Sequence, residues 1–316
     1  MGSFHLLNIS YEDAYNDVWE GHYWGAIIAM PNATHQLNLA IDDGSTLSNS
    51  STAIAYIYNE ARWPTTVEGF VIPSLRQAVS DTNSGYLQNY GVEKLSNANL
   101  SANGIEVLLN GLQAKAVNIY AVTLGIKYYL NTAGMVFPAL IMFLYSMALS
   151  AAPSLIGPLS TRNDFLYRMV VVPIMSCVSG ISWGLWYEAF HESPNGISGV
   201  QYCVIWLTFW MYALIAFLLY DIMVGAIPAA FYPPMVLVYI IINVTAAAFP
   251  IDLKPRFFHL DYVWPGYNCF ELLITILSHG STSRVYRNVP VLFGWLIVLW
   301  PLDTWANKRR SMADLA

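Results

Sequence analysis

Long apolar stretches in the second half of the chain restrict the fold more than any other feature of the sequence. Each is long enough to cross the ~30 Å hydrocarbon core of a bilayer as a helix that rises about 1.5 Å per residue. Only 11% of the residues are charged, whereas soluble domains contain about a quarter. We therefore predict an α-helical polytopic membrane protein with about five spans, over Thr132–Ala152, Leu166–Trp186, Gln201–Leu219, Ala226–Phe249 and Val289–Trp305.

The first 131 residues are more polar, and we predict that they form a mixed α/β domain. Tyr23–Met30 and Thr52–Tyr58 are rich in apolar and aromatic residues next to turn-forming ones, which predicts two strands. Val67–Asn97 has helical spacing, and Asp81–Gly85 is expected to interrupt it. The three cysteines all lie in the second half of the chain, so this domain is expected to hold together without disulfides.

Four N-x-S/T tripeptides lie in this domain, at Asn8, Asn32, Asn49 and Asn99. Each accepts a glycan if the domain reaches the secretory lumen, so we predict that the domain is extracytoplasmic. Asn32 is also placed to cap a helix that follows it. The first ten residues contain no signal peptide. Two explanations stay open: a span that precedes this sequence delivers the domain, which we favour, or the domain stays cytosolic and the tripeptides are not used.

Basic residues predict the orientation of the spans. Arg162 and Arg168 flank the loop between the first two spans, and three basic residues, 308–310, follow the last. Five spans that start from an outside N-terminus place both groups in the cytosol, in agreement with the excess of Lys and Arg in cytosolic loops. The stretch 250–288 opposes this pattern, because its basic residues would then be outside: Lys254, Arg256, Arg284 and Arg287.

A shorter apolar segment lies within that stretch. Cys269–Leu277 is too short to cross the bilayer, contains Glu271 and is followed closely by His279. We predict a re-entrant or interfacial helix here rather than a sixth span.

Short motifs in both halves of the chain resemble, in the same order, those of one membrane-protein family. The motifs are Tyr23–Ile27, Pro31–Thr34, Ile57–Arg62, Trp264–Asn268, His279–Ser281 and Val291–Trp295. In this order they resemble the fungal nitrosoguanidine-resistance family, which is similar to ABC-2 type permeases and to the bacterial phage-infection-protein group. The resemblance covers most of the chain.

The resemblance implies six spans, with one before a large extracytoplasmic domain and five after it in an ABC-2 permease-like bundle. It also implies a re-entrant helical pair ahead of the last span, near residues 262–280, within a transmembrane bundle over 132–316. The sequence departs from the family pattern in two respects. The leading span is absent, and the basic, proline-containing stretch before the second span is reduced to Leu112–Lys115.

Signatures of enzymatic chemistry are missing from the sequence. It contains no G-x-x-x-x-G-K-[ST] phosphate loop, no G-x-G-x-x-G, no H-E-x-x-H and no C-x-x-C. Its six histidines are scattered, without the spacing of metal ligands. We therefore expect no enzymatic activity, no cofactor and no metal site.

Polar and helix-breaking residues near or inside the apolar segments are candidates for a polar path or a gate. Charge at the middle of a span costs roughly 2.5–3.5 kcal/mol, so such residues are seldom kept without a role. Pro233 and Pro234 are expected to kink the fourth span. The full set of candidates is Glu271, Asp221, Asp303, Asn268, Pro233 and Pro234.

Each acidic candidate also has a structural explanation. Asp221 is equally explained as a helix-end residue that water wets at the cytosolic surface. Glu271 would otherwise pair with Arg284 or Arg287. Asp303 lies near the cytosolic end of the last span, where it would extend to water or pair with Lys308.

Two hypotheses of function follow. The first is a permease-like protein that exports or confers resistance to toxic small molecules, or handles lipids. Its transport would use a separate nucleotide-binding subunit, an ion gradient or simple facilitation. The second is a non-transporting scaffold or regulator whose glycosylated ectodomain binds a partner. The expected partners are membrane lipids and a second copy of the chain or such a subunit; the net charge of −6 gives no attraction for nucleic acid. The plasma membrane is the expected location, with another secretory-pathway membrane as the alternative.

Overall fold

The computed structural model of the chain divides it into two compact units. The N-terminal unit comprises residues 1–121 and the C-terminal unit residues 122–316. The structure describes residues 3–43, 53–97, 100–123, 127, 130, 132–157, 160–190, 197–228 and 230–313.

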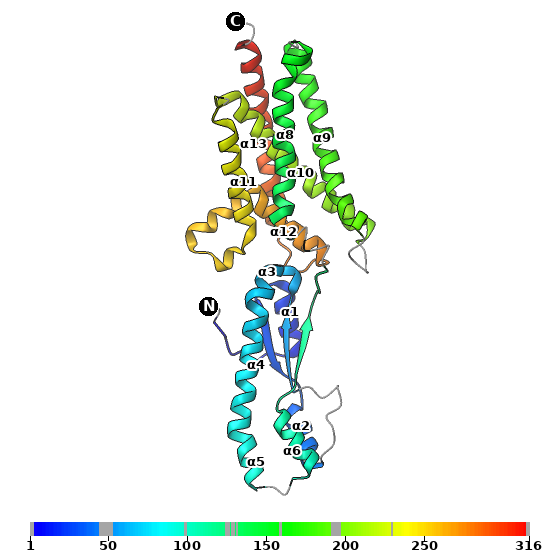
Figure 1. Cartoon of the computed structure of the whole chain (residues 1–316), viewed down its shortest axis with the longest axis vertical. Helices are drawn as coiled ribbons and strands as arrows, with labels where there is room; N and C mark the ends of the chain where they lie inside the picture. Colours follow the sequence, from blue (N-terminus) through cyan, green and yellow to red (C-terminus); the bar gives the residue numbers. More distant parts are fainter. Residues whose placement is uncertain are drawn as a thin grey trace. The chain divides into compact units, whose positions relative to one another are not determined.

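A mixed sheet organises the N-terminal unit, with three strands in the part of the chain that the structure describes (Figure 1). The strands are β1 (Gly25–Ala29), β2 (Ile54–Tyr58) and β3 (Ala114–Asn118). β1 pairs with β2 antiparallel, and β3 pairs with the other edge of β2 in parallel. The two predicted strands are confirmed as β1 and β2, whereas β3 is not evident in the sequence.

Helices cover both faces of the central strand β2. Ile57 packs against α1 (Tyr11–Glu20) on one face, and Tyr56 and Tyr58 pack against α4 (Ile72–Tyr86) on the other. All five residues of β2 are buried, as expected for a strand that is covered on both sides. This apolar core holds the unit together without disulfides.

The helical segment that contains α4 runs without a break. The predicted interruption at Asp81–Gly85 is wrong, because α4 passes through it. Gln77 Nε2 donates a hydrogen bond to Asp81 Oδ1, and Thr82 Oγ1 donates to the carbonyl of Ala78, both at 2.8 Å. These polar side chains therefore bond within the helix instead of ending it. The run consists of α3 (Pro64–Thr66), the π-helical turn η2 (Val67–Val71), α4, the π-helical turn η3 (Leu87–Gly91) and α5 (Val92–Asn97).

Two further helices form a separate apolar cluster in the same unit. α2 (Ala33–Asp43) begins directly after Asn32, as predicted, and packs against α6 (Ala102–Asn110). Gly104 lies so near the neighbouring helix that an added Cβ would be 2.3 Å from the carbonyl oxygen of Ile41. Only glycine permits this close approach. The buried members of the cluster are Leu37, Ile41, Val107 and Leu108.

Two of the sequence motifs meet in the N-terminal unit. The Arg62 guanidinium lies 3.8 Å from the centre of the Trp24 ring, and its Nη1 donates a hydrogen bond to the carbonyl of the residue before that tryptophan at 3.0 Å. Asn118 Nδ2 donates to the Glu60 carboxylate at 2.8 Å. These contacts connect the residues just before β1, the short 3₁₀ helix η1 (Glu60–Arg62) and β3, which is a structural role for these motif residues.

A helical bundle forms the C-terminal unit (Figure 1). α10 occupies its centre, because it contacts α8, α9, α12 and α13 and has the largest buried share among the long apolar helices described. The elements are α8 (Thr132–Ile156), α9 (Thr161–Phe190), α10 (Gly199–Ala226), α11 (Tyr232–Ala248), the 3₁₀ helices η4 (Ile251–Leu253) and η5 (Arg256–Val263), α12 (Pro265–Leu277) and α13 (Val285–Ala313).

Four helices within the described residues are long and apolar enough to cross a membrane, namely α8, α9, α10 and α13. They confirm four of the five predicted spans, and each extends beyond the limits predicted for it. The fifth, α11, has 17 residues and is shorter than the predicted span Ala226–Phe249. α10 continues to Ala226, the first residue of the predicted span, and α11 begins only at Tyr232.

The predicted kink at Pro233 and Pro234 is wrong. Both prolines lie in the first turn of α11, where a missing N–H costs no helical hydrogen bond and the fixed φ of proline suits the start of a helix. They begin the helix instead of bending it. Prolines inside the long helices include Pro138 in α8, Pro173 in α9, and Pro290 and Pro301 in α13.

Candidate functional site: buried charged clusters in the helical bundle

A buried ion cluster connects α9 and α10. Arg168 Nη1 donates hydrogen bonds to both carboxylate oxygens of Asp221, at 2.6 and 2.7 Å. Its Nε donates to the two oxygens of Asp164, one turn earlier on α9, at 3.2 and 3.1 Å. Arg168 is 7% exposed and Asp221 1% exposed. One guanidinium thus binds two carboxylates, a planar arrangement that arginine favours over lysine.

The direction of the two helices explains why these residues meet. Arg168 lies near the start of α9 and Asp221 near the end of α10, and the chain runs in opposite directions along the two helices (Figure 1). The prediction that water wets Asp221 at a helix end is wrong, because α10 continues beyond it to Ala226 and other helices cover it. Its gating role stays a prediction. Arg168 was absent from the predicted site, and its only local indication is the i, i+4 spacing from Asp164.

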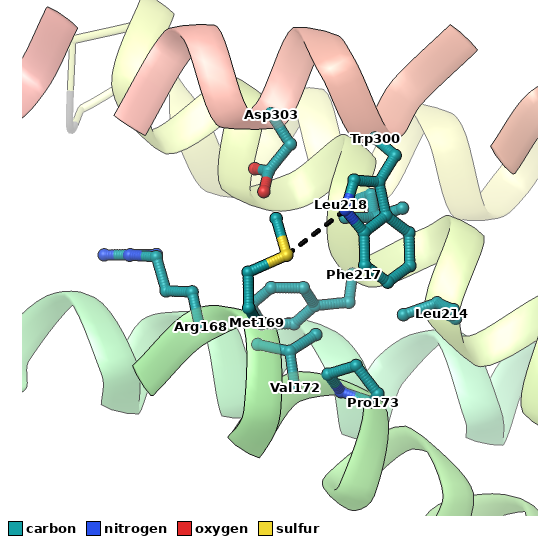
Figure 2. Close-up of a pocket in the computed structure, with 9 residues that line it drawn as sticks. All are labelled: Arg168, Met169, Val172, Pro173, Leu214, Phe217, Leu218, Trp300 and Asp303. Carbon is teal, nitrogen blue, oxygen red and sulfur yellow. Dashed lines mark hydrogen bonds between the residues drawn. The ribbon is translucent and has the colours of Figure 1, made fainter. Parts of the chain in front are cut away.

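A third acidic residue lies beside this cluster. Asp303 of α13 is 3% exposed, and Asn307 Nδ2 donates a hydrogen bond to its Oδ2 at 3.1 Å. The prediction that Asp303 extends to water is wrong, because α13 runs on to Ala313 and places this carboxylate inside the bundle. Figure 2 shows the carboxylate pointing from α13 toward Met169 of α9.

Arg168 and Asp303 line the same small cavity (Figure 2). Its volume is about 10 Å³, which is the space of about one water molecule. The Trp300 indole Nε1 donates to Met169 Sδ at 3.2 Å across it. The remaining residues around the cavity are Val172, Pro173, Leu214, Phe217 and Leu218. The Asp303 carboxylate therefore faces a mostly apolar wall, while the Arg168 guanidinium points away from the other residues drawn (Figure 2).

A second polar cluster surrounds Glu271 on α12. Arg287 Nη2 donates a hydrogen bond to Glu271 Oε2, and the Tyr267 hydroxyl donates to Oε1 at 2.6 Å. The Arg287 guanidinium also lies 4.3 Å from the centre of the Tyr262 ring, a favourable cation–π distance. The predicted pairing of Glu271 with Arg287 is confirmed. Both carboxylate oxygens are engaged, so this group joins α12 to α13 in the observed conformation.

Asn268 and Asn243 hold the start of α12. Asn268 Nδ2 donates to the carbonyls of Tyr262 and Trp264, at 2.8 and 2.9 Å. Asn243 Oδ1 on α11 accepts a hydrogen bond from the Gly266 backbone N–H at 2.8 Å, which satisfies one of the donors that a helix start leaves free. The short helix predicted over Cys269–Leu277 is confirmed and begins earlier, at Pro265. Most of it is buried among α10, α11 and α13.

Other predicted positions are exposed or outside the described residues. Asn8 and Asn32 are exposed. Asn49 and Asn99 lie outside the residues that the structure describes. Over the described ranges, no group of three His, Cys, Asp or Glu side chains is arranged to hold a metal ion. The three cysteines, Cys177, Cys203 and Cys269, are free thiols.

Comparison with known proteins places the chain among membrane proteins. It is 23% identical over 319 aligned residues to an uncharacterized endoplasmic reticulum membrane protein of Saccharomyces cerevisiae, with 91% of this chain and 58% of the yeast protein aligned. The chain thus spans less than two thirds of the length of that relative. No solved structure matches it. A family model described as a protein of unknown function, DUF3533, matches residues 3–301. Together with the four helices of membrane-spanning length, this match identifies the chain as a membrane protein that belongs to the DUF3533 family.

Proposed function

We propose that this protein is a multi-pass, ABC-2 permease-like protein that exports toxic small molecules or moves lipids, and that it is not an enzyme. The observation that carries the proposal is the Arg168–Asp221 ion pair, buried between two helices of membrane-spanning length. Burying such charges is costly, and ionisable residues inside membrane bundles usually belong to transport or relay sites.

In the proposed mechanism the cluster is a latch at one end of the bundle. The closed form is the observed one, in which Arg168 joins α9 to α10. Opening separates the helices and turns the carboxylates of Asp221 and Asp303 toward the widened cavity. Acidic groups in a low-dielectric wall would favour cationic or protonated substrates. Energy comes from an ion gradient or a separate nucleotide-binding subunit, and Glu271 forms part of the polar path when its pair with Arg287 opens.

A flux measurement tests this proposal. Purified full-length protein in liposomes is expected to accelerate either the efflux of a lipophilic cationic dye or the transbilayer movement of a fluorescent phosphatidylcholine, relative to protein-free liposomes. Arg168→Lys keeps the charge but loses the forked geometry. The closed form should lose roughly 1.5–3 kcal/mol, the value of a charged hydrogen bond, so the helices should separate more easily and the rate should rise about tenfold or more.

The matched control for that experiment is Arg162→Lys, at an exposed position near the start of the same helix, which should leave the rate unchanged. Wild-type protein that is folded in liposomes and moves neither probe would contradict the permease proposal.

A second candidate function is a non-transporting scaffold or regulator whose ectodomain binds a partner. The small size of the cavity at the charged cluster favours it, because about 10 Å³ accommodates no drug or lipid headgroup in the observed conformation. Absence of flux, together with a membrane protein that co-purifies with the chain, would support this function instead.

We also propose that the N-terminal unit is extracytoplasmic and glycosylated at Asn8, Asn32, Asn49 and Asn99, in a membrane of the secretory pathway. The yeast relative favours the endoplasmic reticulum over the plasma membrane. Glycosidase treatment of tagged protein should increase its electrophoretic mobility, and Asn32→Gln should remove one step of that shift.

Asn89→Gln is the matched control for the glycosylation test, since Asn89 is exposed and is not followed by an acceptor serine or threonine. A chain whose mobility glycosidase leaves unchanged, and whose N-terminal unit is digested by protease added to sealed microsomes of cytosolic-side-out orientation, would contradict the proposed topology.

A further inference from the structure

The connection between α11 and α12, residues 249–263, turns apolar side chains outward. Phe257 is 74% exposed, Leu260 60% and Val263 55%, and Phe249, Leu253 and Phe258 are exposed as well. Figure 1 shows this connection, in yellow to orange, projecting sideways from the bundle between α11 and α12. So many exposed large apolar side chains in one short segment are unusual on a surface that faces water.

Two charged side chains of the same segment, Lys254 and Asp261, face inward, whereas Asp252 and Arg256 are exposed. Lys254 Nζ donates to Asp261 Oδ2 at 2.7 Å, and it donates to the carbonyls of Thr245 and Ala246 at 3.0 and 2.9 Å. These two carbonyls belong to the last turn of α11, where carbonyl groups lack partners within the helix. A lysine there also offsets the negative end of the helix dipole. Lys254 and Asp261 are thus satisfied internally, as a low-dielectric surrounding requires.

The length of α11 sets the depth of the segment in the bilayer. A helix of 17 residues is ~25 Å long at about 1.5 Å per residue, which is ~5 Å less than the hydrocarbon core. The exposed face of α11 is itself apolar, with Leu237, Val238 and Ile241, and it continues directly into Phe249. The segment therefore follows a face suited to lipid, at a level where the hydrocarbon has not yet ended.

We infer that residues 249–263 form a lipid-inserted element that completes the crossing begun by α11. Phe257 and Leu260 lie among the acyl chains just below the headgroups, and Arg256, which is exposed, contacts the headgroup phosphates. The ion pair between Lys254 and Asp261 stays on the protein side. Because Tyr262 of this segment stacks on Arg287 and accepts from Asn268, lipid contact with the segment also fixes where α12 begins.

Fluorescence quenching from lipid tests this inference. A nitrobenzoxadiazole label is attached to Phe257→Cys, or separately to Leu260→Cys, in full-length protein whose three native cysteines are changed to alanine. The protein is placed in phosphatidylcholine vesicles that contain lipids with a doxyl quencher either near the headgroup or at mid-chain. Ile297→Cys, at an exposed position on α13, is the lipid-facing control, and Ser80→Cys, exposed on α4 of the N-terminal unit, is the water-facing control.

The expected result is blue-shifted emission at positions 257 and 260, with stronger quenching by the doxyl group near the headgroup than by the one at mid-chain. The inference would be overturned if labels at positions 257 and 260 emitted at wavelengths as long as the label at position 80 and were equally unquenched, while the label at position 297 was quenched. That result would leave the assignment of the spanning helices unchanged. Spontaneous disulfide pairing of Phe257→Cys between two copies would also overturn it, since the segment would then contact protein. If the cysteine-free protein fails to fold, the same labels are read as difference spectra in the native-cysteine protein.

Discussion

Replacing Arg168 with leucine is expected to destabilise the helical bundle by about 3–5 kcal/mol, the cost typical of breaking a buried ion pair. Asp221 would keep its charge at 1% exposure without the two hydrogen bonds from Nη1. Thermal unfolding of the detergent-solubilised protein, followed by size-exclusion chromatography, measures the effect as a lower midpoint and a loss of the monodisperse peak.

A double-mutant cycle separates the charge from the packing. Asp221→Leu alone should be as harmful as Arg168→Leu, whereas the double variant should recover much of the loss, because replacing both partners by apolar groups is often neutral. Arg162→Leu, at the exposed start of α9, should change stability by no more than about 0.5 kcal/mol. Additive losses in the double variant would show that the pair is not energetically coupled.

Gly104→Ala is expected to destabilise the N-terminal unit by about 1–3 kcal/mol, as other overpacked interiors are destabilised. The new methyl group would lie 2.3 Å from the carbonyl oxygen of Ile41. That atom belongs to the backbone of α2, so the two helices must separate to admit it. The midpoint of thermal unfolding should fall by roughly 5 °C per kcal/mol, and α2 should become more sensitive to limited proteolysis.

Gly85→Ala is the matched control for this substitution. Gly85 is also helical, in α4, and a Cβ there meets nothing within 4 Å, so only the gain in helix propensity of up to ~1 kcal/mol remains. The two variants share that gain, and their difference isolates the steric cost at Gly104. Equal stability of both variants would mean that α2 and α6 adjust freely, and that their close contact contributes nothing.

Elements with a clear hydrophobic pattern in their own residues could be predicted from the sequence. β1 and β2 follow from short apolar, aromatic runs, and the four long helices from continuous hydrophobicity. β3 could not be found in this way, because Ala114–Asn118 shows neither alternation nor enrichment in β-branched residues. It is a strand because the free edge of β2 accepts it. α1 was not predicted, although the Ser10 and Asp13 side chains that cap its start are a local signal.

The two charged clusters also differ in whether a local pattern predicts their pairing. Glu271 and Arg287 are near each other along the chain, around one short helix, and their pairing was predictable. Arg168 and Asp221 are 53 positions apart, and nothing local relates them. Asp221 was expected in water because its own charge seemed to end the span at Leu219, although the helix continues for another turn and more to Ala226. Because Arg168 pairs with Asp221 inside the bundle, the cost of burying an unpaired carboxylate does not arise, and the helix need not end before Asp221.

The parallel pairing of β2 with β3 determines when the N-terminal unit can finish folding. Ile54 pairs with Ala114, so nearly the whole unit must be synthesised before the middle strand gains its second neighbour. Until then β2 carries an open edge rich in isoleucine and tyrosine, of the kind that recruits other chains. Contacts between such distant positions also form slowly. Newly made protein is therefore most prone to aggregation during this interval, when a molecular chaperone would be of greatest use.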